Sequence, residues 1–400
     1  MFISLIRKAN QFYNDPVLRL WVYGRLATKW RPVETRKSIP PYLANIDLLD
    51  GLPANADTYK EICYNDPVEV KYYQFAGERI KLDPAFYKNI DQDSFLDVES
   101  KLSFHRFAWI EEAGRNLDPN WVCALWKLWV EKYSNALSTS AWDSYTASER
   151  LINILHFSRK FGFPGPREQT VNLLIQHGRQ IYKNLEYFGE SLTGNHLANN
   201  GRGLYLGGLM LGIERWIDVG CRILLEEAKR IFSASGVLRE GSTHYHLLVS
   251  RWYLECWLEA KDNCRTEANA LQKVANSVLS VLPFFNMPGG FPLIGDVSPD
   301  STPAYLYCLL DNTPTGWFNS LSYDQRLAVF KLKETVRRTS LEIKRLDNWR
   351  RMDLRSWTII WHSTSDGWQP MPGHGHQDFG AFELHHGELP VFIDLGRRSY

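Results

Sequence analysis

The 400-residue sequence lacks several features that would each have indicated a particular class of protein. Its net charge is only +1, from 46 Lys and Arg against 45 Asp and Glu, which disfavours the basic field of a nucleic-acid-binding protein. Its six cysteines are scattered without a C-x-x-C pair, so we expect free thiols and no disulfide framework. The longest apolar run, GLYLGGLMLGI, falls short of the roughly 18 residues that a membrane span requires.

The N-terminus also lacks a signal-peptide pattern. In MFISLIRKANQFYNDP a short apolar run is interrupted by Arg7 and Lys8, and it is too short for the apolar region of a signal peptide. The sequence therefore predicts a soluble chain with no export signal. The overall composition, 44% hydrophobic and 23% charged, is typical of globular proteins, and this length favours two domains.

Aromatic residues are abundant, at 14% of the chain with 15 Trp and 19 Tyr. Two interpretations are about equally good. Large rings fill protein cores, and they also line sugar-binding clefts, where flat apolar faces stack on sugar C–H groups and the N–H and O–H groups form hydrogen bonds.

The hydrophobic pattern divides the chain into three parts and predicts an α+β multidomain protein. Residues 1–95 are punctuated by proline and predict a leader of short elements. Residues 96–337 show apolar residues at i, i+3, i+4 and i+7, which predicts a helical domain of successive hairpins. Residues 338–400 alternate apolar and polar residues and predict the start of an antiparallel β domain. Because four or five strands do not easily close a large sandwich, we expect the natural chain to continue past Tyr400.

The first segment with candidate chemistry is LTGNHLANNGRG, residues 192–203. Thr193 or Asn195 could simply cap the following helix. However, Asn195 and Asn199 share one helix face and His196 and Asn200 another, which is more polarity than a cap needs. The glycines at 201, 203 and 207 do not form a dinucleotide-binding loop, because no strand precedes them and the spacing is wrong.

The second segment is EGSTHYH, residues 240–246, at the start of a predicted helix. Tyr245 lies where the positive end of the helix dipole favours a phenolate, and His244 and His246 flank it. A tyrosine normally titrates near 10, so a reactive one needs such surroundings. The alternative is a core tyrosine with Ser242 as an ordinary cap, and this segment alone favours that alternative.

The third segment, GHGHQDFGAFELHHGELPVFIDLG, spans residues 373–396. His374 and His376 would point to one face of a strand, since side chains alternate along it. His376 with Asp394 on the paired strand could supply nitrogen and oxygen ligands to zinc. A third ligand is not evident.

In this order the three segments resemble the heparinase II/III-like polysaccharide lyases, relatives of heparin-sulfate lyases and of some alginate lyases. GNHLANN is similar to the family's Asn-His helix, EGSTHYH to its E-x-S-x-x-Y-H segment, and residues 373–396 to its G-H-x-H-x-D hairpin. WDSYTASERLIN at 142–153 and PLIGDVSPD at 292–300 resemble two further elements. The resemblance runs from about residue 100 to the end and implies an incomplete (α/α) toroid followed by an antiparallel β-sandwich.

The resemblance also implies a reaction and the residues that perform it. Such lyases remove the C5 proton of a uronic acid and break the C4–O bond by β-elimination. Asn195 would hydrogen-bond the uronate carboxylate and His196 would assist it. Tyr245 would protonate the leaving oxygen and could also act as the base. His374 would reach in from the β domain as a base or a carboxylate-neutralising group.

Other implied roles concern the substrate, the metal and the compartment. The residues expected to contact the acidic polysaccharide are Trp142, Tyr145, Arg150, Arg239 and Glu240, the last of these by orienting its neighbours. No cofactor is required, although His376 and Asp394 match positions that hold a structural zinc in relatives, whose third ligand lies further along. The family often has Glu where this chain has Asn199. Relatives are usually periplasmic, whereas no signal peptide is seen here, so the compartment stays open, as does the oligomeric state.

Two alternative functions remain at this point. An (α/α)-toroid glycoside hydrolase would need two flanking carboxylic acids, and Glu240 and Asp296 are the only candidates. A non-catalytic carbohydrate-binding or polysaccharide-biosynthesis accessory protein could also keep this fold. The identity of the polymer and the choice between endo and exo action cannot be predicted from the sequence.

Overall fold

The computed structural model describes residues 12–13, 23, 38–44, 46, 54–55, 58–62, 64–90, 95–189, 192–311, 313–339, 345–347, 349–362, 374 and 381–394. Helices occupy most of the middle of the chain, as the periodicity predicts. In chain order they are α3 (Val98–Arg106), α4 (Trp109–Ala113), α5 (Pro119–Tyr133), α6 (Ser144–Phe161), α7 (Arg167–Lys183), α8 (Asn195–Leu211), α9 (Glu214–Ile231), α10 (Thr243–Asp262), α11 (Ala268–Ser280), α12 (Leu282–Phe285), α13 (Pro303–Leu306) and α14 (Tyr323–Thr339).

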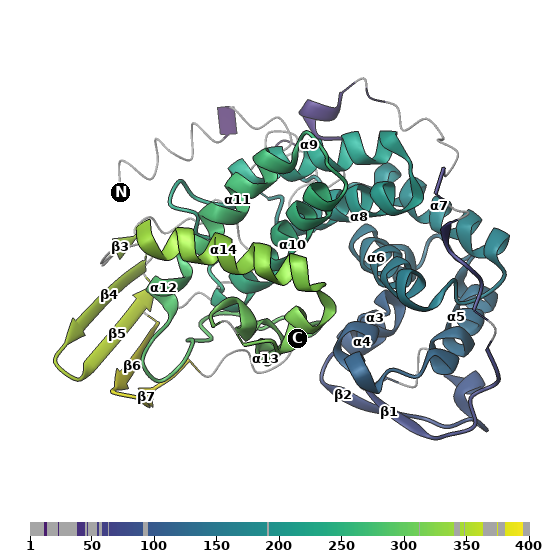
Figure 1. The fold of residues 1–400 in the computed structure, drawn as a ribbon, viewed down its shortest axis with the longest axis horizontal. Coiled ribbons are helices and arrows are strands. Elements are labelled where there is room, and N and C mark those ends of the chain that lie inside the picture. Colours follow the sequence, from purple (N-terminus) through teal and green to yellow (C-terminus); the bar gives the residue numbers. More distant parts are fainter. Residues whose placement is uncertain are drawn as a thin grey trace.

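The helices follow one another around an open arc (Figure 1). Helices α3 to α7 form one side, α10 to α14 form the other, and α8 and α9 lie between them. Helix α8 packs on α6, α7, α9 and α10, and α11 packs on α10 and α14. The predicted order of a helical domain followed by an antiparallel sheet is therefore confirmed. Closure of the arc as an incomplete toroid, and the two boundaries between the three predicted parts, stay predictions.

Close contact between α6, α8 and α9 depends on the glycines of α8 and α9. A Cβ at Gly220 on α9 would lie 2.4 Å from the backbone nitrogen of Tyr205, and a Cβ at Gly203 would lie 2.8 Å from the Cβ of Ser148. These distances are shorter than real side-chain contacts, so the helix backbones can approach this closely only where side chains are absent. The glycine-rich run of α8 is thus explained by helix packing.

The C-terminal sheet has five antiparallel strands in sequential order: β3 (Arg345–Leu346), β4 (Trp349–Leu354), β5 (Trp357–His362), β6 (Phe382–His386) and β7 (Leu389–Phe392). On β5 the side chains of Thr358, Ile360 and His362 are buried and the residues between them are more exposed, which is the period of two expected for a half-buried strand. The assignment of this sheet to a sandwich stays a prediction.

The N-terminal part contains an element that the sequence reading did not specify, the hairpin of β1 (Lys71–Phe75) and β2 (Glu78–Leu82). It packs on α3 and α4, and the rings of Tyr73 and Phe75 contact Trp109. Its buried residues belong to the same apolar cluster as those of α5 and α6. This hairpin is therefore part of the helical core.

Most of the abundant aromatic residues have a structural role. Seven tryptophans are among the largest fully buried side chains: Trp109, Trp121, Trp126, Trp129, Trp216, Trp252 and Trp317. For these residues the core interpretation holds. The described cysteines, Cys123, Cys221, Cys256, Cys264 and Cys308, are free thiols as expected, and Cys63 lies outside the described residues.

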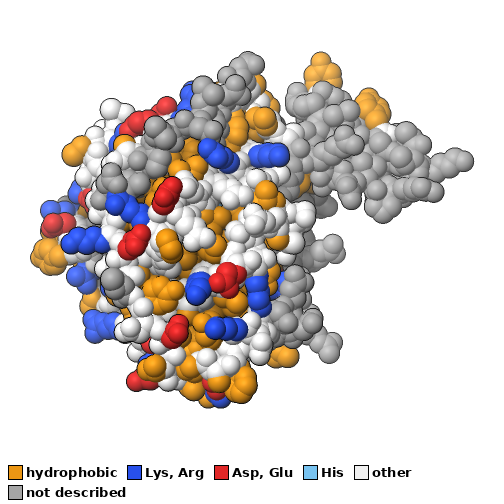
Figure 2. Space-filling model, turned by 90° about the vertical axis from the view of Figure 1, so that its right-hand side faces the viewer, with side chains coloured by type: hydrophobic (Ala, Val, Ile, Leu, Met, Phe, Trp, Pro, Cys, Tyr) orange, Lys and Arg blue, Asp and Glu red, His pale blue; other side chains and the backbone are white. Residues whose placement is uncertain are grey.

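The charge distribution agrees with the small net charge. On the face shown in Figure 2, Lys and Arg side chains alternate with Asp and Glu over the described surface. Within the described part of the chain, every helix is too short or too polar to cross a membrane.

Candidate functional site

The start of helix α8 is held by a carboxylate from the segment before α10. The backbone N–H of Asn195 donates to Glu240 Oε1 at 2.6 Å, and Asn195 Nδ2 donates to Glu240 Oε2 at 2.6 Å. Both residues are 1% exposed. The N-cap is Gly194, so neither Thr193 nor Asn195 caps the helix by its side chain. Glu240 replaces that cap, and its negative charge is favoured at the positive end of the helix dipole.

This contact orients the Asn195 carboxamide. One Nδ2–H is directed at Glu240, and the second is left for another acceptor. The amide oxygen Oδ1 is buried and has no hydrogen-bond partner among the described residues. A neutral amide fixed in this way can donate to a carboxylate and cannot be titrated.

The next residue, His196, is paired with the carboxylate of Glu186, which was not predicted from the sequence. His196 Nδ1 lies 3.1 Å from Glu186 Oε1, and Asn200 Nδ2 donates to Glu186 Oε2 at 3.3 Å. The backbone N–H of Glu186 in turn donates to Asn200 Oδ1 at 3.0 Å. Burial lowers the pKa of His196, but the charge and hydrogen bond of Glu186 together with the charge of Glu240 outweigh it, and the net shift of the pKa is upward. The His196 side chain is 49% exposed, so its imidazole is open to a ligand.

Tyr145 completes this side of the site. Its ring lies 4.6 Å from the His196 ring and 4.9 Å from the guanidinium carbon of Arg106. Arg106 is fixed by Asp300, whose Oδ2 is 2.5 Å from Nη1. Burial raises the pKa of Asp300 to about 6 despite the charge of Arg106.

Tyr245 and His374 meet on the other side. Their rings are stacked, with centroids 3.4 Å apart and planes 9° from parallel. Tyr245 is on the first turn of α10, and its backbone N–H donates to Ser242 Oγ at 3.1 Å. Ser242 is therefore the N-cap of this helix, as the interpretation of Ser242 as an ordinary cap predicted. The Tyr245 residue is 7% exposed and the His374 side chain is 20% exposed.

Two carboxylates flank the His374 imidazole. Nδ1 lies 3.2 Å from Asp296 Oδ2, and Nε2 lies 3.8 Å from Glu240 Oε2. The backbone also joins them, since Asp296 N–H donates to the carbonyl of His374 at 2.9 Å. Because a carboxylate only accepts, the tautomer with its proton on Nδ1 donates to Asp296, and Nε2 then faces Glu240, which also contacts Asn195. Glu240 therefore links Asn195 to the Tyr245–His374 stack.

The two histidines that flank Tyr245 are structural. His244 Nδ1 accepts the backbone N–H of Ser298 at 3.0 Å. His246 Nδ1 accepts from the N–H of Leu238 at 3.2 Å, and its Nε2 donates to the carbonyl of Val278 at 3.0 Å. Burial lowers the pKa of each imidazole to about 4, so both are neutral near pH 7. The polar crowding at 240–246 thus combines one candidate catalytic group, Tyr245, with other buried residues that fix the loop.

Two predicted substrate contacts are wrong, because the residues lie in the core. Arg150 is 0% exposed, donates from Nε to His177 and from Nη1 to the carbonyl of His105, and lies 4.0 Å above the Trp129 ring. Trp142 is 3% exposed and its indole N–H donates to a backbone carbonyl. Neither side chain can reach a polysaccharide. Arg239 is exposed and directly precedes Glu240, so its role stays a prediction.

The predicted zinc ligands are only partly described. His376 lies outside the described residues. Asp394 Oδ2 accepts the backbone N–H of Gly295 at 3.5 Å, and its own N–H donates to Glu383. Among the described residues no group of three or more His, Cys, Asp or Glu could hold a metal ion. Because His376 is not among the described residues, the zinc site stays a prediction.

Sequence reasoning missed the supporting carboxylates for a clear reason. Glu186 is ten residues before His196, and Asp296 is 78 residues before His374, so no local pattern joins them. Asp296 does belong to the G-D element of the family resemblance, which was the one available signal.

The comparisons with known proteins agree with this fold and identify the family. The family model described as heparinase II/III N-terminus matches residues 57–276, and the chain belongs to this family. A crystal structure of heparinase III is similar to this chain, with a TM-score of 0.55 and 18% identity over 95% of this chain and 64% of that one. A heparan sulfate lyase HepC from Pedobacter heparinus has a TM-score of 0.46 and 16% identity over 96% of this chain and 61% of that one. The chain thus spans less than two thirds of these structures. No curated protein matches it.

Proposed function

We propose that the protein is a polysaccharide lyase that cleaves a uronic-acid-containing polymer by β-elimination. The observation that supports this most is the stacking of Tyr245 on His374, joined through Glu240 to the oriented amide of Asn195. These groups come from α8, α10 and the segment before β6, and they are the groups that this reaction needs. Membership of the heparinase II/III family supports the same class of reaction.

The chemical difficulty of the reaction is a poorly acidic C5 proton beside a carboxylate that is already negative. When C5–H breaks, its electron pair forms the C4–C5 double bond, and the C4–O bond breaks as the leaving oxygen takes a proton. The negative charge that builds up toward the carboxylate must be stabilised by fixed donors. The second Nδ2–H of Asn195 and the cationic His196 supply such donors in this proposal.

In this proposal the stacked residues Tyr245 and His374 transfer the protons. The Tyr245 hydroxyl would protonate the leaving oxygen and, when both events occur on one sugar face, would also receive the C5 proton. His374, with Nδ1 directed at Asp296, presents Nε2 as the alternative base or as a second group that neutralises the carboxylate. A tyrosine or histidine positioned in this way contributes about 10²–10⁴-fold to a rate.

The contacts of Glu240 and Asp296 disfavour the hydrolase alternative. Both oxygens of Glu240 accept from Asn195, and Asp296 is directed at His374. A glycosidase needs one carboxylic acid free to protonate the bond and another free to act as a base or nucleophile. The arrangement of these two carboxylates is that of groups that position Asn195 and His374.

A panel of uronate polymers tests the proposal. Sulfated glycosaminoglycans, alginate and bacterial capsular polysaccharides are incubated with the protein while ultraviolet absorbance and reducing ends are both followed. A lyase produces a conjugated C4–C5 double bond, so the absorbance rises together with the reducing ends. Reducing ends without absorbance would establish a hydrolase, and binding without either product would establish a non-catalytic accessory protein.

A further inference from the structure

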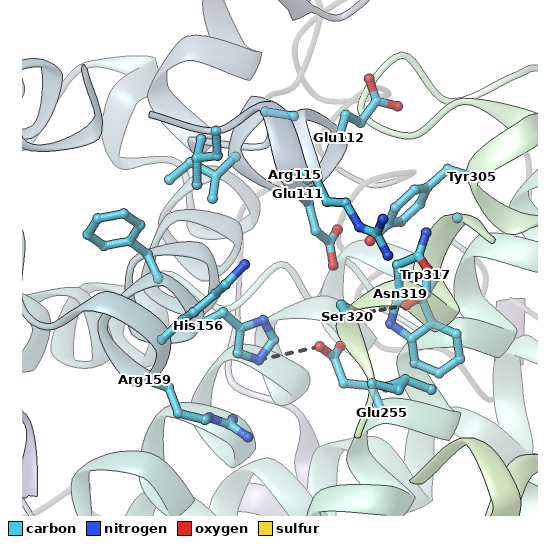
Figure 3. A pocket seen from close by; sticks show the side chains of 18 of the residues that line it. Glu111, Glu112, Arg115, His156, Arg159, Glu255, Tyr305, Trp317, Asn319 and Ser320 are labelled. Atoms are coloured by element: carbon cyan, nitrogen blue, oxygen red, sulfur yellow. Dashed lines mark hydrogen bonds and ion pairs between the residues drawn. The ribbon is translucent and has the colours of Figure 1, made fainter. Parts of the chain in front are cut away.

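A large cavity lies at the opposite ends of helices α6 and α10 from the candidate site. It has a volume of about 770 Å³, and its floor includes His156 of α6 and Glu255 of α10 (Figure 3). Tyr245 and Glu255 are ten residues apart on α10, which is about 15 Å along a helix axis. The volume is within the range of about 300–1,000 Å³ that is usual for small-molecule sites. None of the roles proposed above uses it.

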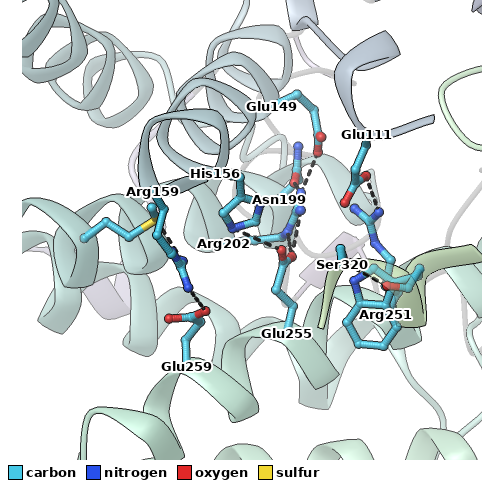
Figure 4. Close-up of polar contacts among 12 residues, drawn as sticks. Glu111, Glu149, His156, Arg159, Asn199, Arg202, Arg251, Glu255, Glu259 and Ser320 are labelled. Carbon is cyan, nitrogen blue, oxygen red and sulfur yellow. Dashed lines mark hydrogen bonds and ion pairs between the residues drawn. The ribbon is translucent and has the colours of Figure 1, made fainter. Parts of the chain in front are cut away.

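Three of the four carboxylates that line this cavity are paired with arginines (Figure 4). Three pairs define the pattern: Glu111 with Arg251 at 2.5 Å, Glu255 with Arg202 at 2.7 Å, and Glu259 with Arg159 at 2.7 Å. His156 adds a contact of 3.5 Å to Glu255, and burial lowers its pKa, so it is neutral. The carboxylate of Glu255 stays ionised, because the charges of Arg202 and Arg251 help to lower its pKa to about 2 against the effect of burial.

The remaining charges around the cavity also balance. Glu112 adds a carboxylate at the rim, Arg115 and Lys160 add cations there, and Arg202 is shared with Glu149 beneath the floor. When Arg202, Arg251 and Glu149 are counted with the charged residues of the lining, carboxylates and cations are equal in number among the described side chains. A ligand with a net charge of either sign gains little from such a surface, and a metal ion would have to displace arginines from these carboxylates.

The lining also offers hydrogen-bonding groups and one accessible aromatic ring. Carboxylate–arginine pairs are fixed acceptors and donors, and hydrogen bonds to charged groups are the stronger ones. Asn319 at the rim can both donate and accept. Tyr305 is half-buried and contributes an aromatic ring to the same cavity, whereas the neighbouring Trp317 and Phe157 rings are 1% and 2% exposed and belong to the core behind it. A compound with many hydroxyl groups and apolar C–H faces matches both parts of this lining.

We infer that this cavity is a second carbohydrate-binding site, which takes an uncharged oligosaccharide of two or three sugars. It differs in charge preference from the site around Asn195 and Tyr245, where a uronate is expected. The inference rests on the composition of the cavity and stands whether or not the protein is a lyase.

Binding measurements on the whole chain test the inference. Cellobiose, maltotriose and N,N′-diacetylchitobiose are the uncharged probes, a uronate disaccharide is the anionic probe, and spermidine is the cationic probe. Calorimetry or ligand-observed NMR gives the dissociation constants for the wild type and for Glu259→Gln, Asn319→Ala and Asn195→Ala. The control variant is Glu226→Gln, an exposed carboxylate on α9 that is paired with Lys229 away from the cavity.

We expect at least one uncharged probe to bind saturably, and Asn319→Ala and Glu259→Gln to weaken it about tenfold or more, which is the effect of losing one good hydrogen bond. Glu226→Gln and Asn195→Ala should leave it unchanged. The inference is overturned if no uncharged probe binds, if the charged probes bind more tightly, or if Asn195→Ala removes the binding. That last result would place the sugar in the candidate lyase site.

Discussion

The substitution Glu240→Gln tests whether the carboxylate before α10 positions Asn195 to hydrogen-bond the uronate carboxylate. The wild-type carboxylate accepts two hydrogen bonds of 2.6 Å, from the backbone N–H and from Nδ2 of Asn195. A glutamine of the same shape offers one oxygen as an acceptor and turns an NH₂ group toward the other donor. One hydrogen bond to a charged group is lost in a site that is 1% exposed.

The expected loss can be stated as a rate. A hydrogen bond to a charged group contributes about 1.5–3 kcal/mol, and each 1.36 kcal/mol corresponds to a tenfold change in rate, so kcat/KM should fall about 10- to 150-fold if the amide acts in the transition state. The assay is the rise in ultraviolet absorbance on a uronate polymer that the wild type cleaves. Thermal unfolding and circular dichroism show whether the variant is folded at the assay temperature.

Glu259→Gln is the matched control, because it makes the same change at the far end of α10. We expect it to keep the wild-type kcat/KM. A folded Glu240→Gln variant with unchanged kcat/KM would refute the idea that the orientation of Asn195 limits the reaction.

Three further predictions concern charges at defined positions. Glu186→Gln removes the carboxylate that holds the pKa of His196 up, so the alkaline fall of kcat/KM should move to lower pH, and an unchanged pH profile would contradict this role. Arg202→Met removes the arginine that pairs with the buried carboxylates of Glu149 and Glu255, and it should destabilise the protein by about 3–5 kcal/mol in thermal or urea unfolding. The exposed control Arg239→Met should change stability by less than about 0.5 kcal/mol. The pKa of His246 falls from 6.5 to about 4 on folding, so the unfolded chain takes up the proton first as the pH falls. The free energy of unfolding should therefore decline between pH 6.5 and 4, by up to about 3 kcal/mol for this residue. His246→Gln should flatten that part of the stability curve.

The strongly periodic part of the fold could be predicted from the sequence because each helix carries its own apolar stripe. The order of helices before strands follows from the change of period near residue 338. The β1–β2 hairpin could also have been predicted in part from its turn. Ala76 and Gly77 both have positive φ, at 50° and 89°, as a two-residue hairpin turn requires. Glycine was there to signal the turn, but alanine at its first position weakened the pattern.

The site was predictable only where family motifs marked it. Asn195, Tyr245 and His374 are brought together, yet their shared contacts with Glu240 and Asp296 depend on how α8, α10 and the sheet pack. Arg150 looked like a carboxylate-binding residue because an arginine at a helical position gives no sign of its burial. Its guanidinium is instead fixed against Trp129 and His177 in the core.

The catalytic rate of Tyr245→Phe tests the central claim most directly. Phenylalanine keeps the ring that stacks on His374 and removes only the hydroxyl that is proposed to transfer protons. On a polymer that the wild type converts to an unsaturated product, we predict a loss of about 10²–10⁴-fold in rate with an unchanged unfolding midpoint. A folded variant that produces the double bond at the wild-type rate would contradict the account.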